Sequence, residues 1–144
     1  MTVLVLVSLA AALSVVILLL RHAHELSNRL ICQSNMKAMA TTSKIYGDAY
    51  PGDAGATIEW LVKRGYLSRE QAVCPSSGLR ESNYVLVPLD PGATSAGTGV
   101  VMYEPKLNHS DEGSNFALAN GHVSFVRGKA YDDLVAQLRS RSPD

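Results

Sequence analysis

The first twenty residues are the most apolar part of the chain. From Thr2 to Leu20 no residue is charged, and only Thr2, Ser8 and Ser14 are polar. As an α-helix rising about 1.5 Å per residue, this run would span roughly 28 Å, close to the ~30 Å hydrocarbon thickness of a bilayer. The pattern therefore predicts a helix that enters a membrane or is buried in an assembly of equally apolar helices.

The helix should continue far beyond this run. No Gly or Pro occurs between Met1 and Tyr46, and Gly47 followed by Pro51 is a helix stop signal. In the second half, apolar residues recur at helical steps, which places them on one face. These are Cys32, Met36, Met39 and Tyr46, and Leu26 and Leu30 also share a face. We predict one helix of about 45 residues, roughly 65–70 Å long, whose second half is amphipathic.

Turn-forming residues divide the rest of the chain into short elements. Thr57 is placed as the N-cap of a short helix that ends before Gly65, and Ser68 to Gln71 has the spacing of a capping box around a single turn. Strands, a Gly/Pro-rich loop and a closing helix follow. Their predicted ranges are 83–87 and 99–103 for the first two strands, 88–99 for the loop, 115–119 and 122–126 for the last two strands, and 131–138 for the helix.

Asn120-Gly121 lies between the last two strands. Asn-Gly is a strong hairpin signal, because both central residues of a type I′ turn need a positive φ. We therefore predict that Asn120 and Gly121 form the turn. The expected core side chains of this hairpin are Phe116, Leu118, Val123 and Phe125.

Together the elements predict an α+β fold, with a long N-terminal helix packed on a small antiparallel sheet of about four strands. Residues 1–47 form the helix, divided into an apolar segment, 1–20, and an amphipathic half, 21–47. Residues 48–144 form a globular α+β head.

Composition and charge exclude several classes of protein. The chain has 144 residues, enough for one modest domain. Its 13 basic and 13 acidic residues cancel, which argues against nucleic acid as a partner, because such binding needs excess positive charge. An apolar share of 47% is too high for a disordered chain. Two cysteines are too few for a disulfide-dense fold or a four-thiolate metal site.

Three interpretations of the apolar run compete. A cleaved secretory signal needs basic residues before the run, and none is present. A simple signal anchor conflicts with Arg21, Arg29 and Lys37, which follow the run and would keep the head in the cytoplasm. The conflict disappears if a short basic leader has been removed and Met1 is the mature N-terminus.

The expected architecture resembles that of type IV pilins and type II secretion pseudopilins, and Met1-Thr2-Val3-Leu4 is similar to the start of a mature pilin. Further on, the chain resembles the pilin-like proteins, abundant in planctomycetes, that carry the prepilin-type processing-associated C-terminal signature. The residues that carry this second resemblance follow one another in the family's order: Cys32-Gln33-Ser34-Asn35-Met36, Tyr46, Pro51, Trp60, Cys74-Pro75, Asn83-Tyr84, His109, Gly113-Ser114-Asn115 and Ala119-Asn120-Gly121-His122-Val123.

The sequence departs from the family pattern at three points. Ten residues separate His109 from Asn120 where the family has nine, and Asn120 replaces an Asp. Asn is an equally good turn residue, which favours a structural role at that position. The largest departure is Val5, where pilins usually carry Glu.

The resemblance implies a structural subunit of an extracellular type IV pilus-like filament on the bacterial surface, with a processed and methylated N-terminus at Met1. Before assembly the subunit would cross the inner membrane once, and its partners would be prepilin peptidase, the pilus assembly machinery and further copies of itself. The residues expected in the filament core are Val3, Leu4, Val5, Leu6, Val7, Leu9, Leu13, Val16, Ile17 and Leu20. Two alternatives remain open: a minor pseudopilin that tips or initiates a secretion pseudopilus, and a single-pass membrane-anchored binding module.

The two cysteines are expected to form a disulfide. An exported head folds in an oxidising space, where two lone thiols usually pair. We therefore predict a Cys32–Cys74 bond that fastens the intervening segment to the long helix.

Little else in the sequence indicates chemistry. No nucleophile motif, phosphate-binding loop or haem-attachment motif is present, so we expect no catalytic residue, no cofactor and no metal. His22 and His24 are expected to be solvated at the membrane interface. His109 and His122 would meet if the hairpin folds back, and we expect them to stabilise a turn.

Two weaker signals lie near His109. Asp111 and Glu112 beside Gly113 offer an acidic loop for Ca²⁺, but they lack the alternating acids of an EF-hand. Asn108-His109-Ser110 matches a glycosylation sequon, a pattern that is common by chance.

Overall fold

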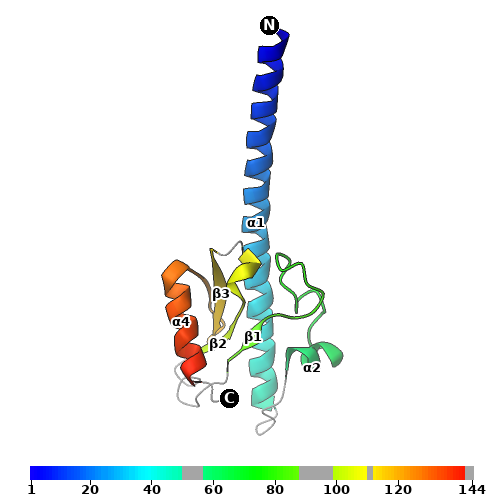
Figure 1. Ribbon diagram of the computed structural model, residues 1–144. Helices are drawn as coiled ribbons and strands as arrows, with labels where there is room; N and C mark the ends of the chain where they lie inside the picture. The colour runs from blue at the N-terminus through cyan, green and yellow to red at the C-terminus, as the bar shows by residue number, and fades with distance from the viewer. Residues whose placement is uncertain (50–56, 88–98, 110–111, 142–144) are drawn as a thin grey trace.

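The computed structural model describes residues 1–49, 57–87, 99–109 and 112–141 (Figure 1). One long helix, α1 (Thr2–Ala49), projects from a small head that gathers around its second half. The other elements are, in chain order, α2 (Ile58–Lys63), β1 (Val85–Leu86), β2 (Val100–Tyr103), a 3₁₀ turn η1 (Lys106–His109), β3 (Gly113–Leu118), β4 (Val123–Arg127) and α4 (Gly128–Arg141). The predicted α+β class is confirmed.

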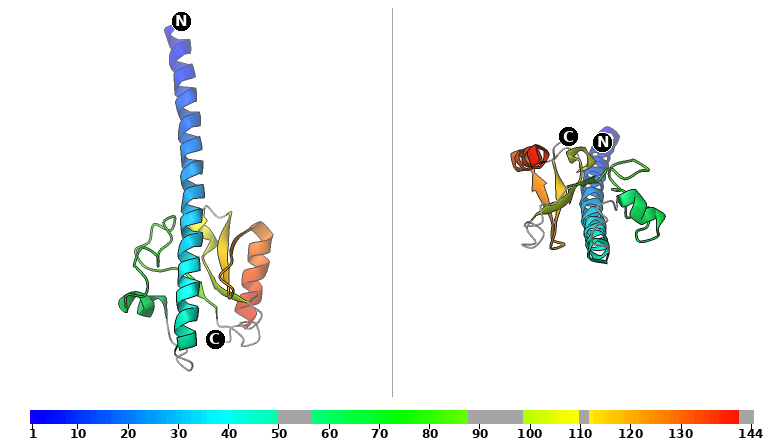
Figure 2. Two further views of the ribbon diagram at one scale, coloured as in Figure 1. Left: turned by 180° about the vertical axis from the view of Figure 1, so that it is seen from behind. Right: turned by 90° about the horizontal axis from the view of Figure 1, so that it is seen from below.

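The four strands form one antiparallel sheet in the order β1-β2-β3-β4, each paired with its neighbour in sequence. The sheet lies between α1 on one face and α4 on the other (Figure 2). Side chains alternate along each strand. Met102 and Ala117 pack with α1, whereas Tyr103 and Phe116 pack with Tyr131 of α4.

The amphipathic half of α1 packs on the head as the periodicity predicts. Cys32, Met36, Met39 and Tyr46 are all buried in one cluster with β2 and β3. Leu26 and Leu30 behave differently, because they lie off this face and remain 43% and 66% exposed. The helix runs to Ala49, past the predicted stop at Gly47, and Pro51 lies outside the described residues.

Local capping signals position the segment that follows α1. The N-cap is confirmed, since Thr57 Oγ1 accepts from the backbone N–H of Trp60 at 3.2 Å. The capping box is also confirmed, because Ser68 and Gln71 each accept a hydrogen bond from the backbone N–H of the other. The first predicted strand shortens to β1, and the predicted loop at 88–99 lies almost wholly outside the described residues.

The hairpin exists, but its turn and register differ from the prediction. The N–H of Gly121 donates to the carbonyl of Leu118, so Ala119 and Asn120 are the central residues of the turn. Gly121 follows with φ +80°, which is the arrangement of a turn closed by a left-handed glycine. The strands pair Asn115 with Phe125, one residue away from a two-residue hairpin. The shift turns Phe116 towards α4, while Val123 and Phe125 face α1.

Gly121→Val should lower the free energy of unfolding by at least about 1 kcal/mol, because a β-branched residue resists a positive φ. No atom other than a Thr41 hydroxyl at 4.0 Å would lie near the new Cβ, so backbone strain is the main cause. Gly121→Asn is the matched control, since Asn tolerates this conformation and should lose less. Thermal and denaturant unfolding check both variants. Equal stabilities for the wild type and the Val variant would contradict the assignment.

Candidate functional site

The first half of α1 contacts nothing else in the described chain. Every residue from Met1 to His24 is exposed, and the hydroxyls of Ser8 and Ser14 donate only to carbonyls of their own helix. By length and composition this helix can cross a membrane, and none of its most apolar stretch is buried by the head. The residues predicted for the filament core are all exposed here: Val3, Leu4, Val5, Leu6, Val7, Leu9, Leu13, Val16, Ile17 and Leu20. An exposed apolar surface of this extent is typical of a segment that interacts with a membrane or with another protein.

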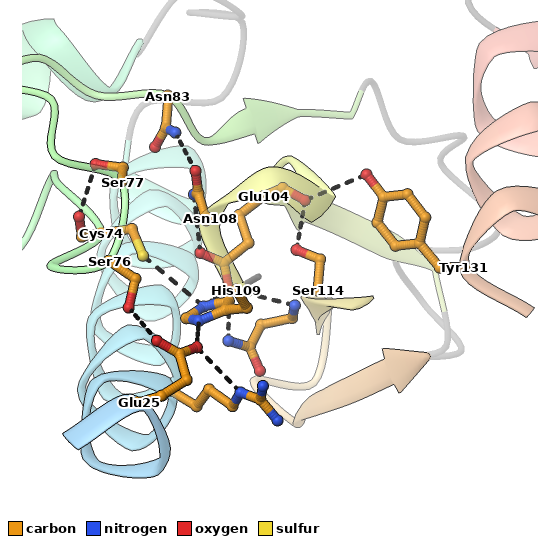
Figure 3. Close-up of polar contacts among 12 residues, drawn as sticks. Glu25, Cys74, Ser76, Ser77, Asn83, Glu104, Asn108, His109, Ser114 and Tyr131 are labelled. Atoms are coloured by element: carbon orange, nitrogen blue, oxygen red, sulfur yellow. Dashed lines mark hydrogen bonds and ion pairs between the residues drawn. The ribbon is translucent and has the colours of Figure 1, made fainter. Parts of the chain in front are cut away.

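A second site lies where α1 enters the head (Figure 3). It consists of Glu25, Cys32, Cys74, Glu104 and His109, which we call the helix–head cluster. Cys32, Cys74, Glu104 and His109 have no exposed surface. One donor atom from each of these four residues lies within 4.8 Å of all the others.

Each member is placed by a simple local rule. Glu25 and Cys32 are two helical turns apart and so share the face of α1 that meets the sheet. Glu104 follows β2 at two residues from Met102, so it also points towards α1. His109 ends η1, and Cys74 lies in the turn-rich segment after α2.

His109 is held between two carboxylates. Its Nδ1 lies 2.7 Å from Glu25 Oε1, and its Nε2 lies 3.0 Å from Glu104 Oε1 and 3.8 Å from Cys74 Sγ. Burial alone would lower the pKa of His109, but its bonds to Cys74, Glu104 and Glu25 raise it to about 10. In this arrangement the imidazole is a cation that neutralises the buried acids.

Glu104 is a fully buried carboxylate with a complete set of donors. Asn115 donates its backbone N–H and its side-chain amide to Oε1, and Asn108 donates its amide to Oε2. Burial would raise the pKa of Glu104, but the bond to His109 and these amides hold it below its ordinary value. Gly113, two residues before Asn115, must be a glycine, because a Cβ at this position would overlap the carbonyl oxygen of Val126 on β4.

Arg29 extends the cluster towards the head surface. Its Nε lies 3.2 Å from Glu25 Oε1, and its Nη2 lies 2.9 Å from Glu112 Oε2. The guanidinium also lies over the ring of Phe125, 4.6 Å from its centroid. Ser76 donates to the second oxygen of Glu25 at 2.9 Å. The segments around Ser76 and Glu112 are thus both bonded to the same turn of α1.

The predicted Cys32–Cys74 disulfide is corrected by the structure, in which both cysteines are free thiols. The prediction brought the right residues together, but their sulfurs are engaged in hydrogen bonds. The bond from Cys32 lowers the pKa of Cys74 to about 7, against the effect of burial, and His109 adds to this shift. The same bond and burial raise the pKa of Cys32. Cys74 is therefore the thiol that ionises first.

The other histidine and acid predictions have mixed outcomes. His22, His24 and His122 are exposed, so His122 does not join the buried His109. Asp111 lies outside the described residues, and Glu112 pairs with Arg29.

Asn108, the acceptor residue of the sequon, is buried and therefore inaccessible to glycosylation in the folded head. The side chain of Asn108 accepts from Asn83 at 2.7 Å and donates to Glu104 at 3.3 Å, and only 5% of the residue is exposed.

Sequence reasoning missed Glu25, Arg29 and Glu104. The sequence does contain a signal for Glu25 and Arg29. Arg29 lies three residues before Cys32 and Glu25 four residues before Arg29, so both lie on the helical face that carries the buried residues of α1. Charged residues on a buried helical stripe indicate a polar partner in the facing layer.

Comparisons of the chain with protein-family models, curated proteins and solved structures found no match. The class is therefore given by the architecture: a long apolar N-terminal helix packed on a four-stranded antiparallel sheet is pilin-like. Four of the residues on which the resemblance was based also meet in space: Cys32, Cys74, His109 and Asn115 all lie in or against the helix–head cluster.

Proposed function

We propose that the chain is a pilin-like structural subunit. It crosses the inner membrane once through the first half of α1 and is then packed by that helix into an extracellular type IV pilus-like filament. Prepilin peptidase and a pilus assembly machinery are the partners that this route requires. The subunit acts by self-association and catalyses no reaction.

The observation that carries this proposal is the exposed apolar helix. About 24 residues, some 35 Å of helix, project from the head and are not covered by any part of it that the structure describes. Leu26, Leu30 and Ile31 continue the apolar surface along the side of α1 that the head leaves open. A bilayer alone would cover the first twenty residues, whereas neighbouring helices in a filament would cover the whole surface.

The closed helix–head cluster supports a structural role as well. An enzyme needs its reactive groups open to substrate. The thiols, the imidazole and the Glu104 carboxylate are instead sealed between α1 and the sheet. Their arrangement fixes the head on the helix.

Val5 bears on the position that the subunit takes in the filament. A pilin resemblance places a Glu there to neutralise the N-terminal ammonium of a neighbouring subunit, and a buried ammonium without a partner costs several kcal/mol. A tip subunit has no neighbour that needs the carboxylate. We favour a main subunit in which carbonyls or the hydroxyls of Thr2 and Ser8 accept from the amine.

Filaments sheared from cells should therefore contain this chain as their main component. Negative-stain microscopy combined with quantitative mass spectrometry of the sheared fraction measures its copy number. One or two copies per filament would contradict the main-subunit assignment and favour the tip. Recovery of the chain only from membranes, in cells that make filaments, would instead favour the anchored binding module.

A further inference from the structure

Four potential metal ligands converge in the helix–head cluster, and each comes from a different segment. Cys32 lies on α1, Cys74 follows α2, Glu104 follows β2 and His109 ends η1. We propose that these four residues hold a Zn²⁺ ion that fastens the head to the long helix. The sequence pattern did not predict this metal site, and the site is a feature separate from the proposed role in filament assembly.

The spacing of the donor atoms fits a tetrahedral ion. Zn–S bonds of about 2.3 Å and Zn–N or Zn–O bonds of about 2.0 Å place neighbouring ligand atoms roughly 3.3–3.8 Å apart. The Cys74 Sγ to His109 Nε2 distance is 3.8 Å, and the His109 Nε2 to Glu104 Oε1 distance is 3.0 Å. All four donors lie within 4.8 Å of one another, so the widest pair must close by roughly 1 Å to reach tetrahedral spacing.

The donor set selects zinc. Two sulfurs, one imidazole nitrogen and one carboxylate oxygen suit a borderline-soft ion without a demand for octahedral geometry. Mg²⁺ and Ca²⁺ prefer oxygen ligands only. All four ligands are buried, which is typical of a closed structural site and leaves no position for a catalytic water.

The groups around the ligands already hold them in the orientation that a metal requires. Glu25 accepts the Nδ1 hydrogen of His109, which leaves Nε2 directed at Cys74 and Glu104. Ligating histidines usually have such a carboxylate partner. Glu104 is fixed by the amides of Asn108 and Asn115.

Zinc binding releases protons from the cluster. Both cysteines bind the ion as thiolates and His109 binds it as a neutral imidazole, so any proton carried on a donor atom leaves to solvent. The thiolate and carboxylate ligands supply the negative charge that a buried Zn²⁺ requires, and no oxidation is involved.

Metal analysis of the full chain, purified in detergent without chelators, tests the proposal directly. The wild type should carry one zinc per chain. Cys32→Ser should lower the zinc content more than tenfold, while His122→Ala, which removes an exposed histidine, should leave it unchanged. Circular dichroism establishes that the Ser variant is folded. Wild-type zinc no higher than that of Cys32→Ser would overturn the proposal.

Thiol labelling distinguishes the site from a disulfide. The wild type, unfolded with a chelator and no reductant, should show two free thiols and release its zinc. Two unlabelled cysteines together with no zinc would overturn the proposal in favour of the Cys32–Cys74 bond.

Cobalt provides a readout that needs no folded variant. Exchange of zinc for Co²⁺ in the wild type should produce a thiolate-to-cobalt absorption band in the near ultraviolet, and its absence would count against two sulfur ligands. All these measurements use the unassembled chain, so their outcome is independent of whether filaments form.

Discussion

Glu104→Ala should lower the free energy of unfolding of the head by about 3–5 kcal/mol, the usual cost of removing one partner from a buried ion pair. The substitution leaves the His109 imidazolium with one carboxylate in place of two. It also leaves the amides of Asn108 and Asn115 without their acceptor, inside a site that water does not reach. Denaturant unfolding of the full chain in detergent measures the change, with a chelator present so that both chains are free of metal.

Glu81→Ala is the matched control, because it removes the same carboxylate from an exposed position. Its effect should stay within about 0.5 kcal/mol. If the Glu104 and Glu81 variants are equally stable, the helix–head cluster does not hold the head on α1. A loss confined to the Glu104 variant supports the described bonding.

Removal of residues 1–20 should abolish filament formation and leave a folded, detergent-free head. The removed residues are all exposed and are not covered by the described part of the head, so the unfolding midpoint should shift by no more than a few degrees, as for a change below about 1 kcal/mol. The truncated chain loses the surface that inserts in a membrane or packs between subunits. Sedimentation, circular dichroism and microscopy of sheared material measure these outcomes.

A second variant distinguishes membrane anchoring from filament assembly. Replacement of residues 2–20 by a run of alternating Leu and Ala keeps a membrane-length helix but changes its packing surface. This chain should stay in the membrane fraction and form few filaments. Filaments from the truncated chain would refute assembly through α1, and an unfolded head would contradict the independence of the two parts.

The elements with strong periodic or capping signals could be predicted from the sequence. The apolar run, the absence of Gly and Pro up to Tyr46 and the N-cap at Thr57 each act through neighbouring residues. The hairpin was placed correctly, but its register was not, because a shift of one residue depends on whether Gly121 lies in the turn or after it. Local sequence does not distinguish the two turns.

The helix–head cluster was predictable only in part, for a different reason. Cys32 and Cys74 are conspicuous as the only cysteines, whereas Glu25 and Glu104 are two ordinary acids among thirteen acidic residues. What makes them special is burial opposite His109, and their partners lie 84 and 5 residues away along the chain. The pairing of Glu25 with His109 across 84 residues is set by the packing of α1 on the sheet, which no local pattern encodes.

The uninterrupted course of α1 has a consequence for the surface of any fibre that it builds. Because α1 is continuous and has no Gly or Pro from Met1 to Tyr46, it has no kink or hinge between the apolar segment and the part that carries the head. The head must therefore follow the helix rigidly. A slip of one residue between neighbouring helices would move each head about 1.5 Å along the fibre and rotate it by roughly 100° about the helix axis. Small differences in interior packing would thus produce large differences in the face that the fibre presents to its surroundings.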